Sequence, residues 1–372
     1  MKLLVNIARV FVGVLFIFSG LIKANDPLGL SYKMQEFFEV WGWNALNDST
    51  LVLSIIMNVF EVVAGIALLI GWNMKLISRL LLLLIIFFTF LTGYALLSGK
   101  IKTCGCFGDC LPLTPLQSFL KDLLLLVLIV FILMKNQLVK PVFAKKLSLI
   151  VLALSVVVIT LGQFYALKHL PFIDCLPYKK GNNIVEKMKV PEGALPDSFS
   201  MYFSYKKAGK IVEFDQEHFP DDFDSTYEFV ERKDKLIRKG NATPAIIDFA
   251  LRTEAGADTT LQILNKPDYY VLLCVKDFAD ISRLDKATYN NIAAICRQKN
   301  ITLFYVTASP EKARQYFGET ATAGHILVCD ATIIKTIVRA NPSYVLMKQA
   351  NVLEKYSYAD ADQFLRALQK LP

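Results

Sequence analysis

Five apolar segments, each about 20 residues long, limit what this chain of 372 residues can fold into. They are residues 4–22, 51–72, 77–98, 116–134 and 147–168. A helix of about 20 apolar residues crosses the hydrocarbon core of a bilayer and satisfies its own backbone hydrogen bonds there. The segments therefore predict five membrane-spanning helices. Charged and polar residues are common after about residue 170 and predict a second, water-soluble half.

The first apolar segment has an alternative interpretation as a secretory signal peptide, with residues 7–20 as its apolar region. No small-x-small cleavage site stands out after it, and Lys23 ends the segment as an anchor would. We therefore expect a membrane-spanning helix. Residues 32–43 carry Met34, Phe37 and Trp41 at helical spacing, which predicts a short helix lying on the bilayer surface.

Lysine in the short loops predicts the orientation of the helices. Residues 135–146 contain four lysines and no acidic residue, whereas residues 23–50 contain two lysines and four acidic residues. Basic loops remain in the cytoplasm, so we expect a cytoplasmic N-terminus in the inner membrane. Five crossings then place the C-terminal half in the periplasm. The net charge of +8 mainly supports this topology. Nucleic-acid binding is not expected, because the basic residues are not clustered among aromatic ones.

Four of the seven cysteines lie in predicted outer segments: Cys104, Cys106 and Cys110 in one loop, and Cys175 after the last apolar segment. An oxidising compartment would let them pair. One explanation is thiol–disulfide exchange, in which a strained Cys104–Cys106 bridge is resolved by Cys110 or Cys175. Another is a static bridge, such as Cys106–Cys110 or Cys110–Cys175. A metal site is a third, but C-x-C-x₃-C is not a standard zinc spacing, and no metal is predicted.

Polar residues inside the apolar segments form a second set of candidate site residues. Glu61 lies near the middle of the second segment, where a carboxylate needs a partner or a proton. Arg9 is the expected partner by depth, and Asn58 shares the helical face of Glu61. Glu61 would act as a quinone-contacting or proton-relay group, or as half of a structural ion pair. Asp122, near the cysteine loop, would tune a thiol or anchor a helix end.

The soluble half changes its pattern at residue 244. Before it, residues 198–205 and 210–214 predict one β-hairpin, and residues 226–230 and 235–239 predict another. After it, strands alternate with helices, which predicts an α/β layer fold. The predicted strands are 269–275, 301–306, 325–329, 343–348 and 352–356, and the predicted helices are 281–298, 310–317 and 360–371.

Residues 1–140 resemble the four-helix membrane proteins of the DoxX superfamily, and its MauE-like branch in particular. The resemblance rests on Arg9, Gly13, Ser19, Gly20, Lys23, Glu61, Gly65, Gly71, Asp122 and the string Cys104-Gly-Cys106-Phe-Gly. MauE-like proteins are implicated in forming disulfides in exported partners. The resemblance therefore implies thiol oxidation with quinone as the electron acceptor. The fifth helix, within residues 141–170, exceeds the four-helix unit and is expected to be a tether.

Residues 244–372 resemble a thioredoxin-like domain of the peroxiredoxin or membrane-anchored type. The carrying residues are Pro244-Ala-Ile-Ile-Asp-Phe-Ala-Leu and Ala340-Asn-Pro342, and the resemblance implies a cis Pro342 at a binding surface. A working thioredoxin has C-x-x-C after the strand 269–275. This chain has Lys276-Asp-Phe-Ala there, so we expect the domain to bind a protein rather than reduce one. Bacteroidetes-type proteins that fuse these two modules are similar to this chain.

These observations predict an all-α membrane bundle of 4+1 transmembrane helices and an extracytoplasmic α/β thioredoxin-like domain with a β-rich insert. The expected domains are 1–140, 141–170 (the tether), 171–243 (the insert) and 244–372. The expected function is thiol–disulfide exchange or quinone-linked electron transfer, with the lipid bilayer and an extracytoplasmic client protein as partners. The alternative is a non-enzymatic assembly or scaffold protein with structural disulfides.

Overall fold

The computed structural model describes residues 1–372 except 102, 104, 216, 239, 241 and 319–324. The chain forms two compact units. The first unit comprises Met1–Gly181 together with Ala250–Pro372, and the second comprises Asn182–Phe249. The first unit contains the apolar helices and a five-stranded sheet, and the second contains a three-stranded sheet.

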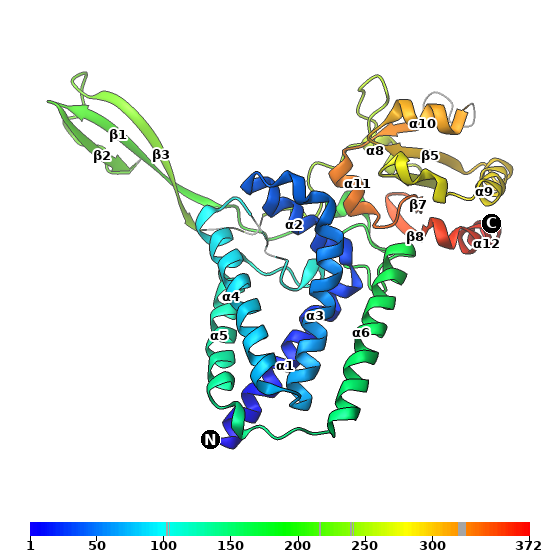
Figure 1. Cartoon of the computed structure of the whole chain (residues 1–372). Helices are drawn as coiled ribbons and strands as arrows, with labels where there is room; N and C mark the ends of the chain where they lie inside the picture. The colour runs from blue at the N-terminus through cyan, green and yellow to red at the C-terminus, as the bar shows by residue number, and fades with distance from the viewer. Residues whose placement is uncertain (102, 104, 216, 239, 241, 319–324) are drawn as a thin grey trace. The chain divides into compact units, whose positions relative to one another are not determined.

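Five helices in the described part of the chain are long and apolar enough to cross a membrane, which confirms the predicted number. They are α1 (Lys2–Asn25), α3 (Thr50–Ile70), α4 (Met74–Ser98), α5 (Pro115–Met134) and α6 (Lys145–Lys168). The N-terminus lies at one end of this bundle, and helix α2 (Pro27–Trp41) lies at the other, which we call the α2 end (Figure 1). The chain is therefore a multi-pass membrane protein in a lipid bilayer.

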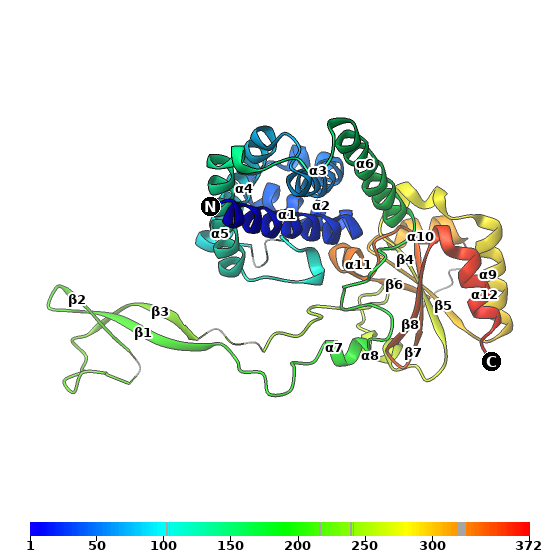
Figure 2. The same ribbon diagram turned by 90° about the horizontal axis from the view of Figure 1, so that it is seen from below.

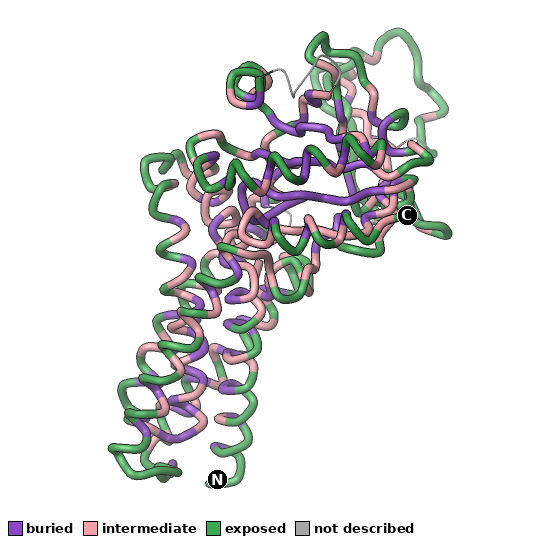
Figure 3. The backbone as a smooth tube through the Cα atoms, turned by 90° about the vertical axis from the view of Figure 1, so that its right-hand side faces the viewer, coloured by how far each residue is buried: buried purple, intermediate pink, exposed green. Residues whose placement is uncertain are grey.

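Glycines bring α1 and α3 into close contact. A Cβ atom at position 65 would lie 2.8 Å from the carbonyl oxygen of Gly13, and one at position 20 would lie 3.0 Å from the backbone nitrogen of Val62. Small residues let membrane helices approach in this way. The outward helix faces are exposed (Figure 3) and carry leucine, isoleucine, valine and phenylalanine, as a lipid-facing surface does.

The five-stranded sheet has the strand order β6-β5-β4-β7-β8. Its strands are β4 (Tyr270–Val275), β5 (Thr302–Thr307), β6 (Ile326–Val328), β7 (Ser343–Lys348) and β8 (Asn351–Ser357). Strand β4 is parallel to β5 and antiparallel to β7, and all six of its residues are buried. A continuous apolar run of this kind is typical of a strand covered on both faces.

Helices cover this sheet and build its core. Helices α9 (Lys286–Gln298) and α12 (Ala361–Gln369) lie side by side over one face (Figure 2), where Tyr289, Tyr344 and Phe364 are buried. The remaining helices here are α8 (Thr260–Leu264), α10 (Pro310–Phe317) and α11 (Ala331–Ile337), and the sequence patterns predicted only α10 of these. The described strands and helices make this C-terminal region β-rich; its thioredoxin-like identity stays a prediction.

The second unit is a short helix and an antiparallel sheet with the order β2-β1-β3. Its elements are α7 (Ile184–Lys187), β1 (Ser198–Lys207), β2 (Lys210–Asp215) and β3 (Glu228–Arg238). The predicted hairpin over 226–239 is wrong, because β3 continues through the expected turn. It does so because β1 offers hydrogen-bonding partners along its length, from Ser198 opposite Arg238 to Lys206 opposite Glu228.

Candidate functional site

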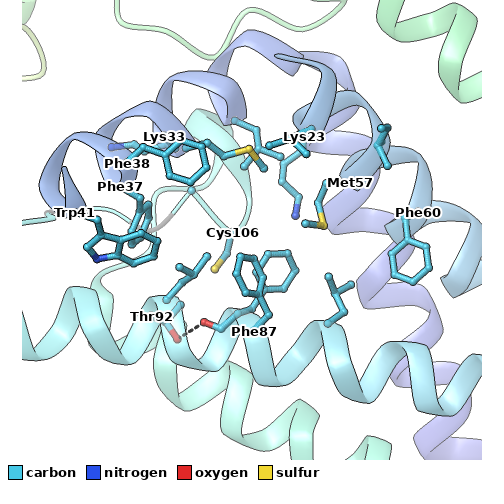
Figure 4. A pocket seen from close by; sticks show the side chains of 18 of the residues that line it. Lys23, Lys33, Phe37, Phe38, Trp41, Met57, Phe60, Phe87, Thr92 and Cys106 are labelled. Atoms are coloured by element: carbon cyan, nitrogen blue, oxygen red, sulfur yellow. Dashed lines mark hydrogen bonds between the residues drawn. The ribbon is translucent and has the colours of Figure 1, made fainter. Parts of the chain in front are cut away.

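A cavity of about 400 Å³ lies between α1, α2, α3, α4, α5 and the cysteine loop, which we define as residues 99–114 (Figure 4). Its volume is within the range of small-molecule sites. Its wall is largely apolar and aromatic. The aromatic and sulfur-containing side chains that line it include Met34, Phe37, Phe38, Trp41, Met57, Phe60, Phe87, Phe88 and Cys106.

Helix α2 forms the wall of the cavity at the α2 end of the bundle (Figure 4). The helix begins where the sequence favours it: Asp26 is the N-cap and accepts a hydrogen bond from the backbone nitrogen of Gly29 at 3.1 Å, and Pro27 occupies the first position. It ends at Gly42, whose φ of 74° suits glycine. Trp41 packs on Tyr94 of α4 with a centroid distance of 5.6 Å and thereby fixes α2 on the bundle.

Cys106 places its sulfur in the cavity, between the rings of α2 and those of α4 (Figure 4). The residue is half-buried and has no disulfide partner among the described cysteines. Burial raises the pKa of its thiol, and the nearby Lys121 ammonium opposes this effect. The neutral thiol is therefore the resting form at neutral pH. A thiolate must form before the sulfur can attack a disulfide.

Glu61 is buried near the backbone of Cys106 and is paired with Lys23. The Lys23 ammonium donates to Oε1 of Glu61, while Oε2 lies 3.0 Å from the Ser19 hydroxyl oxygen. That hydroxyl oxygen also lies 2.9 Å from the carbonyl oxygen of Cys106. A hydroxyl has one hydrogen and can donate to only one of these acceptors at a time. Ser19 thus connects the intramembrane carboxyl group of Glu61 to the cysteine loop.

The prediction that Arg9 pairs with Glu61 is wrong, because the partner of Glu61 is Lys23. Arg9 lies beside Gly71 at the end of α3, where an added Cβ would be 3.2 Å from its Nη1 atom. Gly71 is ten residues beyond Glu61, or about 15 Å along a helix. The depth estimate failed because α1 and α3 are staggered, so that Gly20 rather than Arg9 is level with Asn58 and Val62. Nε and Nη1 of Arg9 have no hydrogen-bond partner among the described residues.

Asp122 forms a second buried ion pair on the other side of the cavity. Its carboxylate accepts from the Lys121 ammonium at 2.6 Å and from the Thr92 hydroxyl at 3.0 Å, and its side chain is fully buried. Lys121 and Thr92 both line the cavity. Asn58 is placed differently: it donates to Gln163 of α6 at 3.0 Å and fastens that helix to α3.

Cys110 forms a disulfide with Cys175, one of the pairings that the sequence left open. It joins the cysteine loop to the segment after α6. Cys104 lies outside the described residues. The other three cysteines, Cys274, Cys296 and Cys329, are buried, and burial raises the pKa of each thiol.

The predicted binding residue Pro342 is buried, and the Asn341–Pro342 peptide bond is cis. Sequence reasoning missed Ser19, Thr92 and Arg339 as site residues. Ser19 lies four residues before Lys23 and so shares its helix face, which was the available signal. Within the described residues, no group of three or more histidine, cysteine or acidic side chains could hold a metal ion.

The part of the chain that forms the cavity is similar to a known protein family. Residues 1–135 match the family model for methylamine utilisation protein MauE, and residues 199–239 match a family model described as a domain of unknown function. No curated protein and no solved structure matches the chain. All residues that line the cavity lie within the first match, so the cavity and residues 1–135, which we call the membrane region, are MauE-like.

Proposed function

We propose that this MauE-like membrane protein oxidises thiols outside the cytoplasm and transfers the electrons to a membrane quinone that binds beside Cys106. The observation that carries the proposal is a cysteine side chain in an aromatic cavity inside the bundle. A lipid-soluble, ring-shaped acceptor could reach such a cavity from the bilayer, and its ring could stack on the aromatic side chains.

The charges around the cavity fit a neutral ligand. Three lysines line it, and each has a carboxylate partner: Lys23 pairs with Glu61, Lys121 with Asp122, and Lys33 with Glu36. The cavity therefore offers no net charge to attract an ion. An ammonium group has three N–H donors, so Lys23 and Lys121 each keep donors that could bind a carbonyl oxygen.

The proposed reaction balances with two cysteines. Oxidation of two thiols to one disulfide releases two electrons and two protons, and both pairs are needed to reduce one quinone to a quinol. Cys106 supplies one sulfur, and we propose Cys104, its neighbour in the C-x-C string, for the other. One thiolate of a client with two cysteines would then attack this bridge to form a mixed disulfide. The second thiolate of the client would resolve it, so that the client leaves with a disulfide and both cysteines return to thiols. Lys23, which lines the cavity, would pass protons between the thiols and the quinone together with its partner Glu61 and the neighbouring Ser19.

The five-stranded sheet and its helices lie within Ala250–Pro372, which we call the α/β region. This region fits the role of a thioredoxin-like module without a dithiol. Its strand β7 follows the cis Asn341–Pro342 bond and is antiparallel to β4, which supports the resemblance. Lys276 stands after β4, where a working enzyme would carry cysteine. The Cys110–Cys175 disulfide favours an oxidising compartment, and hence a periplasmic location for this end of an inner-membrane protein.

Quinol formation tests the proposal. The protein is placed in liposomes with a short-chain ubiquinone and a reduced, unfolded protein as thiol donor. We expect quinol and donor disulfide to form in equal amounts. Cys104→Ser and Cys106→Ser should each abolish both products, while Cys296→Ala, which changes a buried packing cysteine, should retain the rate. Equal rates in all variants would overturn the proposal.

A second candidate function is that of a non-enzymatic assembly protein, because the Cys110–Cys175 bridge also suits such a protein. In that case the cysteine loop is a structural staple and the α/β region is a binding module. The redox state of Cys106 in cells would then stay constant when the quinone pool is reduced or oxidised. Thiol trapping with mass spectrometry separates the two functions.

A further inference from the structure

The face of the α/β region beside the cis Asn341–Pro342 bond lies against the membrane region of the same chain. Three cationic side chains of this face take part: Arg339, Lys335 and Lys276. Their partners are Asp26 and Tyr32 at the start of α2, and Asp109 of the cysteine loop.

Arg339 is the centre of this contact. Its side chain is only 4% exposed, and each of its three guanidinium nitrogens donates a hydrogen bond. Nε reaches Asp26 at 2.7 Å, Nη2 reaches Asp109 at 2.6 Å, and Nη1 reaches the Lys335 carbonyl oxygen at 2.7 Å. Guanidinium–carboxylate bonds of this kind are charge-assisted and directional. Burial raises the pKa of Asp26, and the Arg339 charge draws it back down.

Arg339 thereby ties together two parts of the cavity wall. Asp26 is the N-cap of α2, the helix that contributes Phe37, Phe38 and Trp41 to the wall. Asp109 lies in the cysteine loop, three residues after Cys106. A rigid planar group bound to both carboxylates fixes the distance between α2 and this loop.

Neighbouring contacts strengthen the link. The ring of Tyr32 lies 5.5 Å from the Arg339 guanidinium and 5.1 Å from the Lys335 ammonium, within cation–π range. The Lys276 ammonium donates to the Arg339 carbonyl oxygen and lies 3.4 Å from the Tyr32 hydroxyl. Burial raises the pKa of Tyr32 to about 12, so its hydroxyl stays neutral.

We propose that the α/β region is an intramolecular clamp on the cavity, and that Arg339 is the positioning residue that holds α2 and the cysteine loop closed over Cys106. Release of Arg339 would open the cavity toward the α2 end and give a thiol in water access to Cys106. The clamp concerns access to the cavity and is independent of the ligand that the cavity binds.

Labelling of Cys106 by a water-soluble maleimide tests the clamp. The full-length protein in detergent is labelled for increasing times, and mass spectrometry of its peptides assigns the label to Cys106. Arg339→Gln should raise the initial rate at least fivefold. The matched control is Arg314→Gln, which breaks the more exposed Arg314–Glu254 pair of the same region and should leave the rate within twofold.

Arg339→Gln could fail to fold, because it leaves Asp26 without its counter-charge. Asp109→Asn is the second variant, since Asp109 is 43% exposed and its loss leaves the Arg339–Asp26 pair intact. It should raise the rate two- to fivefold while the Cys110–Cys175 disulfide stays formed. Rates within twofold of wild type for Arg339→Gln overturn the clamp, and if that variant is not recovered, a wild-type rate for Asp109→Asn does so.

Discussion

The membrane region and the α/β region both contain cysteine, but they place it in different surroundings. In the membrane region Cys106 lines a cavity, next to two buried ion pairs. In the α/β region Cys274, Cys296 and Cys329 are at most 3% exposed and lie among packed side chains. Sulfur in the second region acts as a small apolar side chain.

Among the described cysteines, this difference favours Cys106 for thiol chemistry. A reactive cysteine needs access to a partner and nearby groups that stabilise or create the thiolate. Cys106 has a cavity for a partner and Lys121 close enough to lower its pKa against the effect of burial. The α/β region instead offers charged side chains that bind the membrane region. The fold that resembles a redox domain thus serves as a docking domain in our proposals.

The strongest test of this comparison is the reactivity of the cysteines in one native sample. Cys106 should react with a small uncharged alkylating agent roughly 1,000-fold faster than the three cysteines of the α/β region. Those three become accessible only when their region opens, which costs several kcal/mol in a stable domain. Quantitative mass spectrometry of the alkylated peptides measures all four rates together. Comparable rates would show that the two regions do not differ in the way described.

The next largest effect is expected from the buried ion pair. Glu61→Gln leaves Lys23 as an unpaired charge inside the bundle and should lower the free energy of unfolding by about 3–5 kcal/mol. Glu254→Gln removes the more exposed Arg314–Glu254 pair of the α/β region and should change the free energy of unfolding by less than about 1 kcal/mol. Unfolding by SDS in mixed micelles measures both. The double variant Lys23→Met with Glu61→Gln should recover most of the loss, and a double variant as unstable as Glu61→Gln contradicts the ion-pair explanation.

A pH-dependent effect is expected from Lys276. Burial, together with the charge of Arg339, lowers the pKa of Lys276 to about 7, whereas an unfolded lysine has a pKa near 10.5. Between these values the unfolded chain holds a proton that the folded chain has lost, so stability rises as the pH rises from 7 to 9. The full linkage slope gives about 2.7 kcal/mol over that interval, and partial solvent access reduces it to roughly 1–2 kcal/mol.

Lys276→Met isolates this contribution. The free energy of unfolding of the variant, relative to that of wild type, should fall by roughly 1–2 kcal/mol between pH 7 and pH 9. The free energy of unfolding of each protein is measured at each pH, and the two values are subtracted. The subtraction removes the contribution of the other titrating groups, because both proteins contain them. A constant difference across this range would show that Lys276 keeps its proton in the folded protein.

The smallest effect is expected at Ser19. Ser19→Ala removes the hydroxyl between Glu61 and the carbonyl group of Cys106 and should lower stability by about 1 kcal/mol. Ser155→Ala serves as the control, because that hydroxyl donates to the carbonyl oxygen of Leu152 in its own helix. A larger loss of thiol oxidation than of stability in Ser19→Ala would assign Ser19 to proton transfer. Equal, small losses of stability and of thiol oxidation in both serine variants would show that Ser19 contributes only to packing.

The sequence predicted the helices and most strands because their signals are local. The length of each apolar segment was enough to predict all five spanning helices. Strand β4 was predicted in the same way, from a short continuous apolar run. The partner of Glu61 was missed because it depends on the stagger between α1 and α3, which Gly13, Gly20 and Gly65 set by close contact. No pattern along one segment contains that stagger.

The docking role of Arg339 was also beyond the sequence. Its two carboxylates are 313 and 230 positions away in the chain, and only the folded structure brings them together. The same holds for strand β3, whose expected turn was replaced by pairing with β1. Pairing between distant segments decided each of these cases, and single-sequence propensity contains no information about it.

The Cys110–Cys175 bridge closes a covalent ring of the chain that includes α5, α6 and the connection between them. A protease that cuts this connection, at residues 135–144, would yield two fragments that migrate as one species on a non-reducing gel and separate once the bridge is reduced. During biosynthesis the ring can close only after residue 175 has reached the side of the bilayer on which Cys110 lies. The last helix must therefore be inserted before the covalent architecture of the protein is complete.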